Sequence, residues 1–316
     1  MSAAKRNKIA IIGAAGTVGS ALAFYLCTRG TAREIVLIDV NANRLSAHLM
    51  DIEQAASPLS STRVKGGTYA DLADTAIVVV ACSAPDTGTT DRSASAQKNL
   101  TLVREAARHI RDYCPHAVVI TMTNPVDVLN HAVWQETGLE RARCLGFSTN
   151  DTVRFRRAIA EVANVSPRDV YALVVGEHGP NQVPLFSSIS VKGERLTLSA
   201  DQQSTVNENL RGWFRRYIDL KSGRTTGWTS AIGATTLIEQ ILEGFDGVIS
   251  TSVVPAGEYG LTGLSIGLPV RVGSHGVLRI EQLALTDIEA EALERASEAI
   301  KRSLAAVSAT ALPPFS

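Results

Sequence analysis

The segment Val175-Gly176-Glu177-His178-Gly179-Pro180 contains the residue type best suited to exchange a proton at neutral pH. His178 follows an apolar run, Tyr171 to Val175, and lies between Gly176 and Gly179. We therefore expect it in a turn at a strand end, exposed and mobile enough to meet a ligand. Histidine has an unperturbed pKa near neutrality, which favours a role as general acid or base. For this segment alone, a histidine in a surface loop is the alternative.

Two charged residues upstream could complete such a site. Asp151 can orient a histidine and stabilise its imidazolium. Arg154, three residues later on a predicted helix, lies on the same face as Asp151, and its guanidinium matches a carboxylate in two-point geometry. An exposed ion pair between the two residues is the simpler alternative. Together with His178 they suggest hydride transfer to a 2-oxo acid, which needs a proton donor, its partner and a cation for the substrate carboxylate.

Two further polar residues are expected where the strands of the predicted sheet end. Arg92 closes a Gly/Thr-rich loop that begins at Asp86, and such a loop overlies the carboxyl edge of a parallel sheet, where ligands bind. Arg92 could polarise a substrate carbonyl as negative charge develops there. Asn124 ends the next strand at the same edge and could bond substrate or nicotinamide, unless it caps the following helix.

A glycine-rich segment near the N-terminus predicts a dinucleotide-binding loop. Gly13, Gly16 and Gly19 follow the first apolar run and open a predicted helix. Gly13 permits a tight turn, Gly16 lets the backbone approach a pyrophosphate, and Gly19 allows close helix–strand packing. Asp39 ends the next strand about 20 residues further on, where a carboxylate accepts from a ribose 2′-hydroxyl and repels a 2′-phosphate. This favours NAD over NADP, although Asp39 could simply cap the following turn.

Apolar runs and helical spacings predict a regular alternation of elements in the first half. We expect strands over 8–13, 34–40, 75–82 and 116–123, and helices over 19–30, 44–56, 95–113 and 128–137. This alternation predicts an α/β fold with a doubly wound parallel (Rossmann) sheet in an NAD-binding domain, residues 1–147. Helices over 151–163, 201–217, 229–243 and 287–307, with strands between 247 and 280, predict an α+β substrate domain in residues 148–316.

The composition restricts the classes of function. Lys and Arg together number 31, as do Asp and Glu together, so no basic excess favours nucleic acid or a membrane surface. The apolar runs are shorter than the roughly 18 residues of a membrane-spanning helix, and Met1 to Lys8 does not resemble a signal peptide. The four cysteines lack metal-ligand spacing, so we expect free thiols, no metal site and a cytoplasmic protein.

The chain resembles the lactate/malate dehydrogenase family from about residue 7 to residue 306. Four motifs occur in family order and spacing, and the loop glycines and Glu177 are most similar to the lactate dehydrogenase-like malate dehydrogenases, which are typically tetramers. The motifs are the Gly13–Gly19 loop with Asp39, Thr123-Asn124-Pro125-Val126-Asp127, Asp151-Thr152-Val153-Arg154-Phe155, and Gly176-Glu177-His178-Gly179.

The resemblance implies an NAD-dependent L-2-hydroxy acid dehydrogenase that forms a homotetramer or homodimer. Its substrate would be a small 2-oxo or 2-hydroxy acid, with His178 as the acid/base. By matching position, the catalytic residues would be His178, Asp151 and Arg92, the substrate-binding residues Arg154 and Asn124, and further cofactor-binding residues Asn99 and Asn124.

Asp86 departs from the family at a position that bears on the substrate. Six residues before Arg92, malate dehydrogenases carry an arginine that pairs with the distal carboxylate of oxaloacetate, and lactate dehydrogenases carry glutamine. An aspartate facing a dicarboxylate would cost about 2–5 kcal/mol relative to arginine. We therefore expect a different substrate, such as a 2-oxo acid with a cationic or hydroxylated side chain. Arg224 is a second cation that could instead restore malate as the substrate.

Other functions remain as alternatives. Malate dehydrogenase proper is the first of them. An NAD-dependent glycosidase, which would need a metal site with cysteine and histidine ligands, and a non-catalytic NAD-binding protein are more distant. A smaller departure is Pro180, which replaces the aspartate usual after His-Gly and could alter the turn that carries His178.

Overall fold

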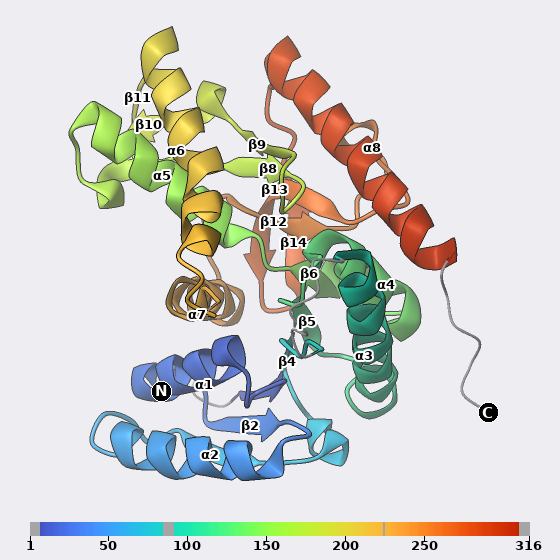
Figure 1. Cartoon of the computed structure of the whole chain (residues 1–316). Coiled ribbons are helices and arrows are strands. Elements are labelled where there is room, and N and C mark those ends of the chain that lie inside the picture. Colours follow the sequence, from blue (N-terminus) through green and yellow to red (C-terminus); the bar gives the residue numbers. More distant parts are fainter. Residues whose placement is uncertain (1–6, 85–91, 224, 310–316) are drawn as a thin grey trace.

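The computed structural model describes residues 7–84, 92–223 and 225–309, in which strands of both halves of the chain join one central sheet (Figure 1). The first half contains the strands β1 (Lys8–Ile12), β2 (Glu34–Ile38), β3 (Arg63–Gly66), β4 (Ile77–Val80), β5 (Val118–Thr121) and β6 (Cys144–Gly146). Its helices are α1 (Thr17–Arg29), α2 (Ala42–Ala56), α3 (Arg92–Tyr113) and α4 (Val126–Thr137), with short 3-10 helices η2 (Tyr69–Leu72) and η3 (Arg141–Arg143).

The second half contains four longer helices and eight short strands within the described residues. The helices are α5 (Thr149–Ala163), α6 (Ala200–Asp219), α7 (Gly227–Glu243) and α8 (Asp287–Ala309), with the 3-10 helices η4 (Pro167–Asp169), η5 (Phe186–Ser188) and η6 (Glu258–Gly260). The strands are β7 (Val170–Tyr171), β8 (Val174–Gly176), β9 (Gln182–Pro184), β10 (Ser190–Val191), β11 (Glu194–Arg195), β12 (Ile249–Val253), β13 (Ile266–Gly273) and β14 (Gly276–Ile280).

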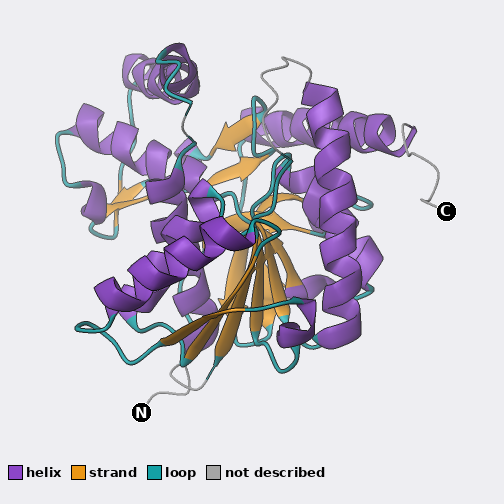
Figure 2. Ribbon diagram, turned by 60° about the horizontal axis from the view of Figure 1, so that its bottom comes forward, coloured by secondary structure: helices purple, strands orange, loops and turns teal. Residues whose placement is uncertain are grey.

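The first half confirms the predicted doubly wound sheet. Its strands are parallel and run in the order β3-β2-β1-β4-β5-β6. Side chains alternate along each strand, so β1 buries residues on both faces. Ile9 and Ile11 belong to the core cluster that includes α1, whereas Ala10 and Ile12 belong to the cluster that includes α3. Figure 2 shows these strands as a twisted fan with helices on both sides.

Two strands of this sheet were not predicted, and their lengths explain why. β3 (Arg-Val-Lys-Gly) buries one of its four residues at the edge of the sheet, and β6 has three residues. Neither strand is long enough to display the period of two from which strands are predicted. The other boundaries differ from the prediction by a few residues, as at α1, which begins at Thr17 rather than Gly19.

The sheet does not stop at the end of the first half. Ser252 of β12 pairs antiparallel with Gly146 of β6, and β13 pairs with β12. β8 then pairs with β13 through Gly176 and Gly267, so the order continues β6-β12-β13-β8-β9. The sequence pattern did not predict this continuation. It connects the strand that leads to His178 with the strands of the first half through backbone hydrogen bonds.

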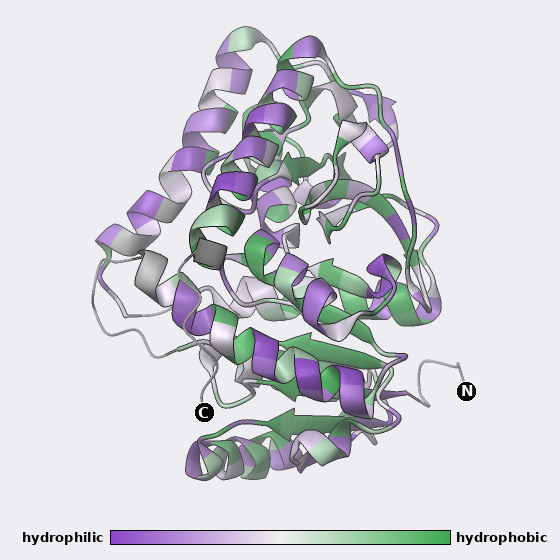
Figure 3. Ribbon diagram, turned by 90° about the vertical axis from the view of Figure 1, so that its right-hand side faces the viewer, coloured by the Kyte–Doolittle hydropathy of each residue, from purple (hydrophilic) through white to green (hydrophobic). Residues whose placement is uncertain are grey.

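Hydrophobic residues concentrate on the strands, whereas hydrophilic and hydrophobic residues alternate along the helices (Figure 3). α1 packs against α7, so a helix of the second half covers part of the first. The four cysteines are free, as predicted, and three of them are buried. No helix in the described ranges is long and apolar enough to cross a membrane.

Candidate active site

His178 lies in the turn between β8 and β9, which confirms the predicted position at a strand end. Its Nδ1 is 2.6 Å from Asp151 Oδ2, and its backbone N–H donates to Asp127 Oδ2 at 2.7 Å. The side chain is only 18% exposed. The expectation of an exposed histidine is therefore wrong, because two carboxylates, one from α4 and one from α5, hold the residue in place.

The backbone of this turn depends on its neighbours. Gly176 has a φ of +85°, and a Cβ there would lie 2.9 Å from the carbonyl oxygen of Asn181. The carboxylate of Glu177 accepts the backbone N–H of Asn181 at 3.2 Å and closes the turn. Pro180 lies inside this turn, and the contact between His178 and Asp151 is nevertheless made.

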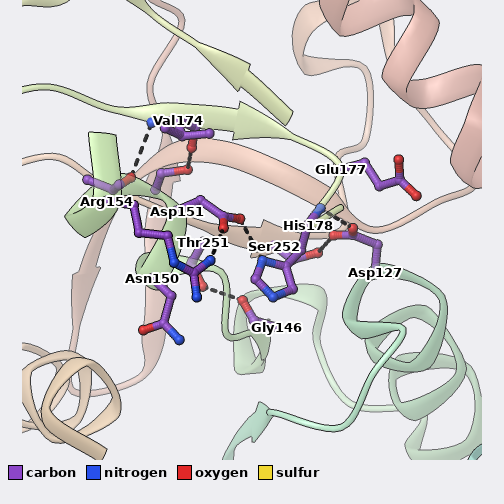
Figure 4. Close-up of polar contacts among 12 residues, drawn as sticks. Asp127, Gly146, Asn150, Asp151, Arg154, Val174, Glu177, His178, Thr251 and Ser252 are labelled. Atoms are coloured by element: carbon purple, nitrogen blue, oxygen red, sulfur yellow. Dashed lines mark hydrogen bonds and ion pairs between the residues drawn. The ribbon is translucent and has the colours of Figure 1, made fainter. Parts of the chain in front are cut away.

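Helix α5 presents Asp151 and Arg154 on one face, as their spacing predicts (Figure 4). Arg154 donates from one terminal nitrogen to Asp151 Oδ1 at 3.1 Å, while the other oxygen of Asp151 faces His178. The side chains of Arg154 and Asp151 are 20% and 9% exposed. The pair is thus not the exposed ion pair of the simpler alternative, because one buried carboxylate holds both a histidine and an arginine.

The electrostatics of the site favour a protonated histidine. Burial alone would lower the pKa of His178, but the charge and hydrogen bond of Asp151 and the charge of Asp127 raise it above its ordinary value. Arg154 acts in the opposite direction on the pKa of His178. Burial lowers the pKa of Arg154 itself, and the charge of Asp151 opposes this effect.

An aromatic residue that was not predicted as part of the site packs on Arg154. The guanidinium carbon lies 4.2 Å from the ring centroid of Trp213 on α6, a cation–π geometry, and Trp213 in turn stacks on Tyr217 at 5.2 Å. The described helix α6 thus covers one face of Arg154. No sequence signal links residues 154 and 213, because the contact joins two separate helices.

Asp127 is a second residue of the site whose role was not predicted from the sequence. It lies in the first turn of α4 and is 3% exposed. Burial raises its pKa to about 6, although hydrogen bonds from Ser252 and from the backbone of His178 oppose the shift. A carboxylate inside the apolar run Val126 to Leu129 was the available signal, since charged residues are rarely buried without partners.

The predicted dinucleotide loop has a backbone that needs glycine. Gly13 has a φ of +88°, and a Cβ there would collide with the backbone of Cys82. A Cβ on Gly19 would collide with the carbonyl oxygen of Gly13, so α1 packs directly on the loop. Gly16 is the N-cap of α1 and offers no side chain to the amides of the first turn. This arrangement fits a pyrophosphate at the helix N-terminus.

Asp39, at the end of β2, closes the loop from the side. Its Oδ2 accepts the backbone N–H of Ala15 at 2.9 Å, and its Oδ1 accepts that of Asn41 at 2.9 Å. The turn-capping role is therefore present. The same contacts hold the carboxylate beside the glycine loop, where the ribose of a dinucleotide is expected.

Asn99 and Asn124 meet at the carboxyl edge of the sheet. The side chain of Asn99 accepts the N–H of Ala84 at 2.8 Å and donates to the backbone carbonyl of Asn124 at 2.9 Å. Both ends of the Asn99 amide thus bind backbone. Asn124 is exposed, and the N-cap of α4 is Pro125 rather than Asn124, so the simpler capping role of Asn124 is not observed.

Three predicted residues cannot be placed with the others. Asp86 and Arg224 lie outside the described residues. Arg92 begins α3, and its side chain also lies outside what the structure describes. The structure thus brings His178, Asp151 and Arg154 together.

Comparisons with known proteins show the family to which the chain belongs. Residues 7–146 match the lactate/malate dehydrogenase NAD-binding domain, and residues 149–311 match the lactate/malate dehydrogenase α/β C-terminal domain. The chain is 32% identical over 304 residues to L-lactate dehydrogenase of Corynebacterium glutamicum, covering 93% of this chain and 96% of the relative. It is 31% identical over 295 residues to malate dehydrogenase of Halobacterium salinarum, covering 92% and 96%.

A solved structure gives the same result. Lactate dehydrogenase of Cryptosporidium parvum, complexed with lactic acid and NAD, superposes with a TM-score of 0.90 at 29% identity, covering 98% of this chain and 99% of the other. The chain therefore belongs to the lactate/malate dehydrogenase family and is an NAD-dependent oxidoreductase that acts on the CH–OH group of 2-hydroxy acids.

Proposed function

We propose that His178 donates a proton to the carbonyl oxygen of a 2-oxo acid during reduction and removes it from the L-2-hydroxy acid in the reverse direction. The observation that carries this proposal is the 2.6 Å contact between His178 Nδ1 and Asp151. Because Nδ1 faces Asp151, Nε2 is the ring nitrogen left to meet the substrate. NAD, when bound, supplies or accepts the hydride.

Asp151 would fix the orientation of the ring and stabilise the imidazolium before the proton is transferred. The raised pKa of His178 supports this role, because the proton donor must be charged at neutral pH. Loss of the proton during reduction leaves a neutral imidazole beside a carboxylate. The same carboxylate then favours reprotonation from water and prepares the site for another turnover.

Arg154 would bind the substrate carboxylate. Its guanidinium donates from one nitrogen to Asp151 and has further N–H groups, enough for two-point contact with a second carboxylate. Trp213 covers one face of the guanidinium, and the N–H donors at the edge of the guanidinium stay available to a carboxylate. By matching position, Arg92 would polarise the carbonyl, Asn124 would support substrate and cofactor, and Gly13, Gly16, Gly19, Asp39 and Asn99 would hold NAD.

The preferred substrate would differ from oxaloacetate because of Asp86. A carboxylate at the specificity position repels the distal carboxylate of a dicarboxylic acid. A 2-oxo acid with a cationic or hydroxylated side chain would interact favourably with Asp86. Malate dehydrogenase proper is the second candidate, with Arg224 as the residue that would neutralise the second carboxylate.

The test is NADH-dependent reduction of oxaloacetate, pyruvate, and basic and polyhydroxy 2-oxo acids, compared by kcat/KM. Oxaloacetate preferred by tenfold or more, about 1.4 kcal/mol, would contradict the role given to Asp86. The control variant His178→Gln should keep its affinity for NADH and lose about 10²-fold or more in kcat. A wild-type protein that binds NADH but reduces no acid of the panel would contradict the proposed acid/base chemistry.

We further propose that residues 1–147 bind the cofactor and residues 148–316 the substrate, which is supported by the two family matches at 7–146 and 149–311. We propose a homotetramer or homodimer, by family resemblance, which light scattering coupled to size-exclusion chromatography would test. Free thiols at all four cysteines support a cytoplasmic location.

A further inference from the structure

The turn that carries His178 is held from the cofactor-binding half of the chain by one side chain. Asp127 lies in the first turn of α4, three residues after Asn124. Its Oδ2 accepts the backbone N–H of His178 at 2.7 Å, and its Oδ1 accepts the hydroxyl of Ser252 at 2.5 Å. Figure 4 shows Asp127 approaching His178 from the side opposite to Asp151. One carboxylate therefore contacts both the histidine turn and β12.

The hydrogen bonds donated to both oxygens of Asp127 favour the ionised form of its carboxyl group. A backbone N–H can only donate, so Oδ2 must accept. The hydroxyl of Ser252 lies 2.9 Å from that of Ser265, which lies 2.8 Å from the side-chain nitrogen of Asn130. Ser252, Ser265 and Asn130 are fully buried. Because Asn130 donates to Ser265, the two serine hydroxyls can both be oriented so that Ser252 donates to Asp127.

The charged groups around the imidazole are few in the described part of the chain. Asp151 and Arg154 reach it from α5, Asp127 from α4, and Glu177 precedes it in the turn. Asp151 is already shared with Arg154, whose positive charge opposes the protonation of His178. A second negative charge on the other side of His178 compensates for this arginine.

We propose that Asp127 is a positioning residue for His178: its carboxylate holds the backbone of the histidine turn, and its charge, with that of Asp151, stabilises the protonated imidazolium. This inference rests on the proposed role of His178 as acid/base. The two functions of Asp127 can be separated, since the hydrogen bonds depend on its oxygens and the electrostatic effect depends on its charge.

The substitution Asp127→Asn removes the charge of this side chain and keeps its capacity for hydrogen bonds. The asparagine oxygen can accept the N–H of His178, and its amide can donate to Ser252, which can then donate to Ser265. We expect the variant to fold and the pKa of His178 to fall by about one unit. Reduction requires protonated His178, so the midpoint at which kcat/KM for reduction declines with rising pH should move to lower pH by the same amount.

A second readout does not use activity. The ring signals of His178 are identified by comparison with His178→Gln, and their NMR titration is recorded in the wild type and in Asp127→Asn without cofactor. We expect the titration midpoint to move down together with the kinetic midpoint. A purely structural role would lower kcat and leave both midpoints in place, which would overturn the proposal.

Glu289→Gln is the matched control. Glu289 is also a buried carboxylate that accepts a backbone N–H from another segment, that of Ser187 at 3.0 Å, and it contacts none of the site residues. It should leave the midpoint of His178 unchanged. If the control moves the midpoint as far as Asp127→Asn does, general disturbance explains the shift and the proposal fails.

Should Asp127→Asn not fold, the wild type provides a decisive measurement. The ¹³C carboxyl shift of Asp127 must report an ionised group at the pH where His178 gains its proton, and a neutral acid there would overturn the proposal. Failure of the proposed function is distinct, since it would appear as a wild-type protein inactive on every 2-oxo acid. The NMR midpoints would still test the electrostatic effect of Asp127 in that case.

Discussion

Asp127→Asn should also change how the stability of the protein depends on pH. Burial raises the pKa of Asp127 from 3.8 to about 6 in the folded state. Below pH 3.8 both the folded and the unfolded chain hold this proton, and the carboxyl has no effect on the pH dependence of stability. As the pH rises from 3.8 to about 6, the unfolded chain releases the proton first, so the free energy of unfolding falls.

The structure sets the size of this effect. The rise of the pKa from 3.8 to about 6 corresponds to about 3 kcal/mol of stability lost by the wild type at neutral pH. Asp127 is 3% exposed, so solvent screening reduces the figure little. The asparagine variant has no proton to release. Its free energy of unfolding relative to the wild type should therefore increase by about 1.4 kcal/mol between pH 5 and pH 7.5, about half of the full effect.

Urea unfolding followed by tryptophan fluorescence at both pH values measures this difference. Ser265→Ala is the control, because it alters the same buried network without removing a titratable group, and its effect on stability should be equal at pH 5 and pH 7.5. A difference between Asp127→Asn and the wild type that stays constant or shrinks as the pH rises would refute the reasoning. It would show that the hydrogen bonds from Ser252 and His178 outweigh the cost of burying the charge.

Three other substitutions test the site. Asp151→Asn removes the partner of His178 and should lower kcat/KM for reduction by about 10²–10⁴-fold, with an unchanged Kd for NADH in a fluorescence titration. Trp213→Leu removes the aromatic face that holds Arg154 and should raise KM for the 2-oxo acid about fivefold, or about 1 kcal/mol, with little change in kcat. An unchanged KM would show that Trp213 does not support substrate binding. Asp86→Arg should raise kcat/KM for oxaloacetate relative to pyruvate by about 30-fold or more, and steady-state assays on both acids would expose a failure.

The residues that could be predicted are those whose spacing along the chain reflects one local element. Asp151 and Arg154 are three positions apart on a helix, and the glycines of the loop follow a buried strand, so sequence alone places them. His178 could be assigned to a strand end for the same reason. Its burial could not, because the carboxylates that hold it come from α4 and α5.

The features that could not be predicted depend on contacts between distant segments. The contact between Trp213 and Arg154 joins α6 to α5, and no periodicity encodes it. The pairing of Gly146 with Ser252 involves a strand of three residues, which is too short for its sequence to indicate a partner strand or the direction of pairing. Asp127 was visible as a charge among apolar residues, but its partner Ser252 lies 125 residues away in the sequence.

The pairing of β6 with β12 has a mechanical consequence for turnover. A hinge motion that closed the two halves of the chain around the cofactor would have to break the pairing of β6 with β12 and the contact between Asp127 and Ser252. Backbone pairing instead joins the glycine loop and the histidine turn through one continuous sheet, so we expect the distance between the proposed proton donor and the proposed dinucleotide site to change little while substrates bind and leave. We therefore expect the motions that admit substrate in segments outside this sheet, and helix α6, whose Trp213 packs on Arg154, is such a segment.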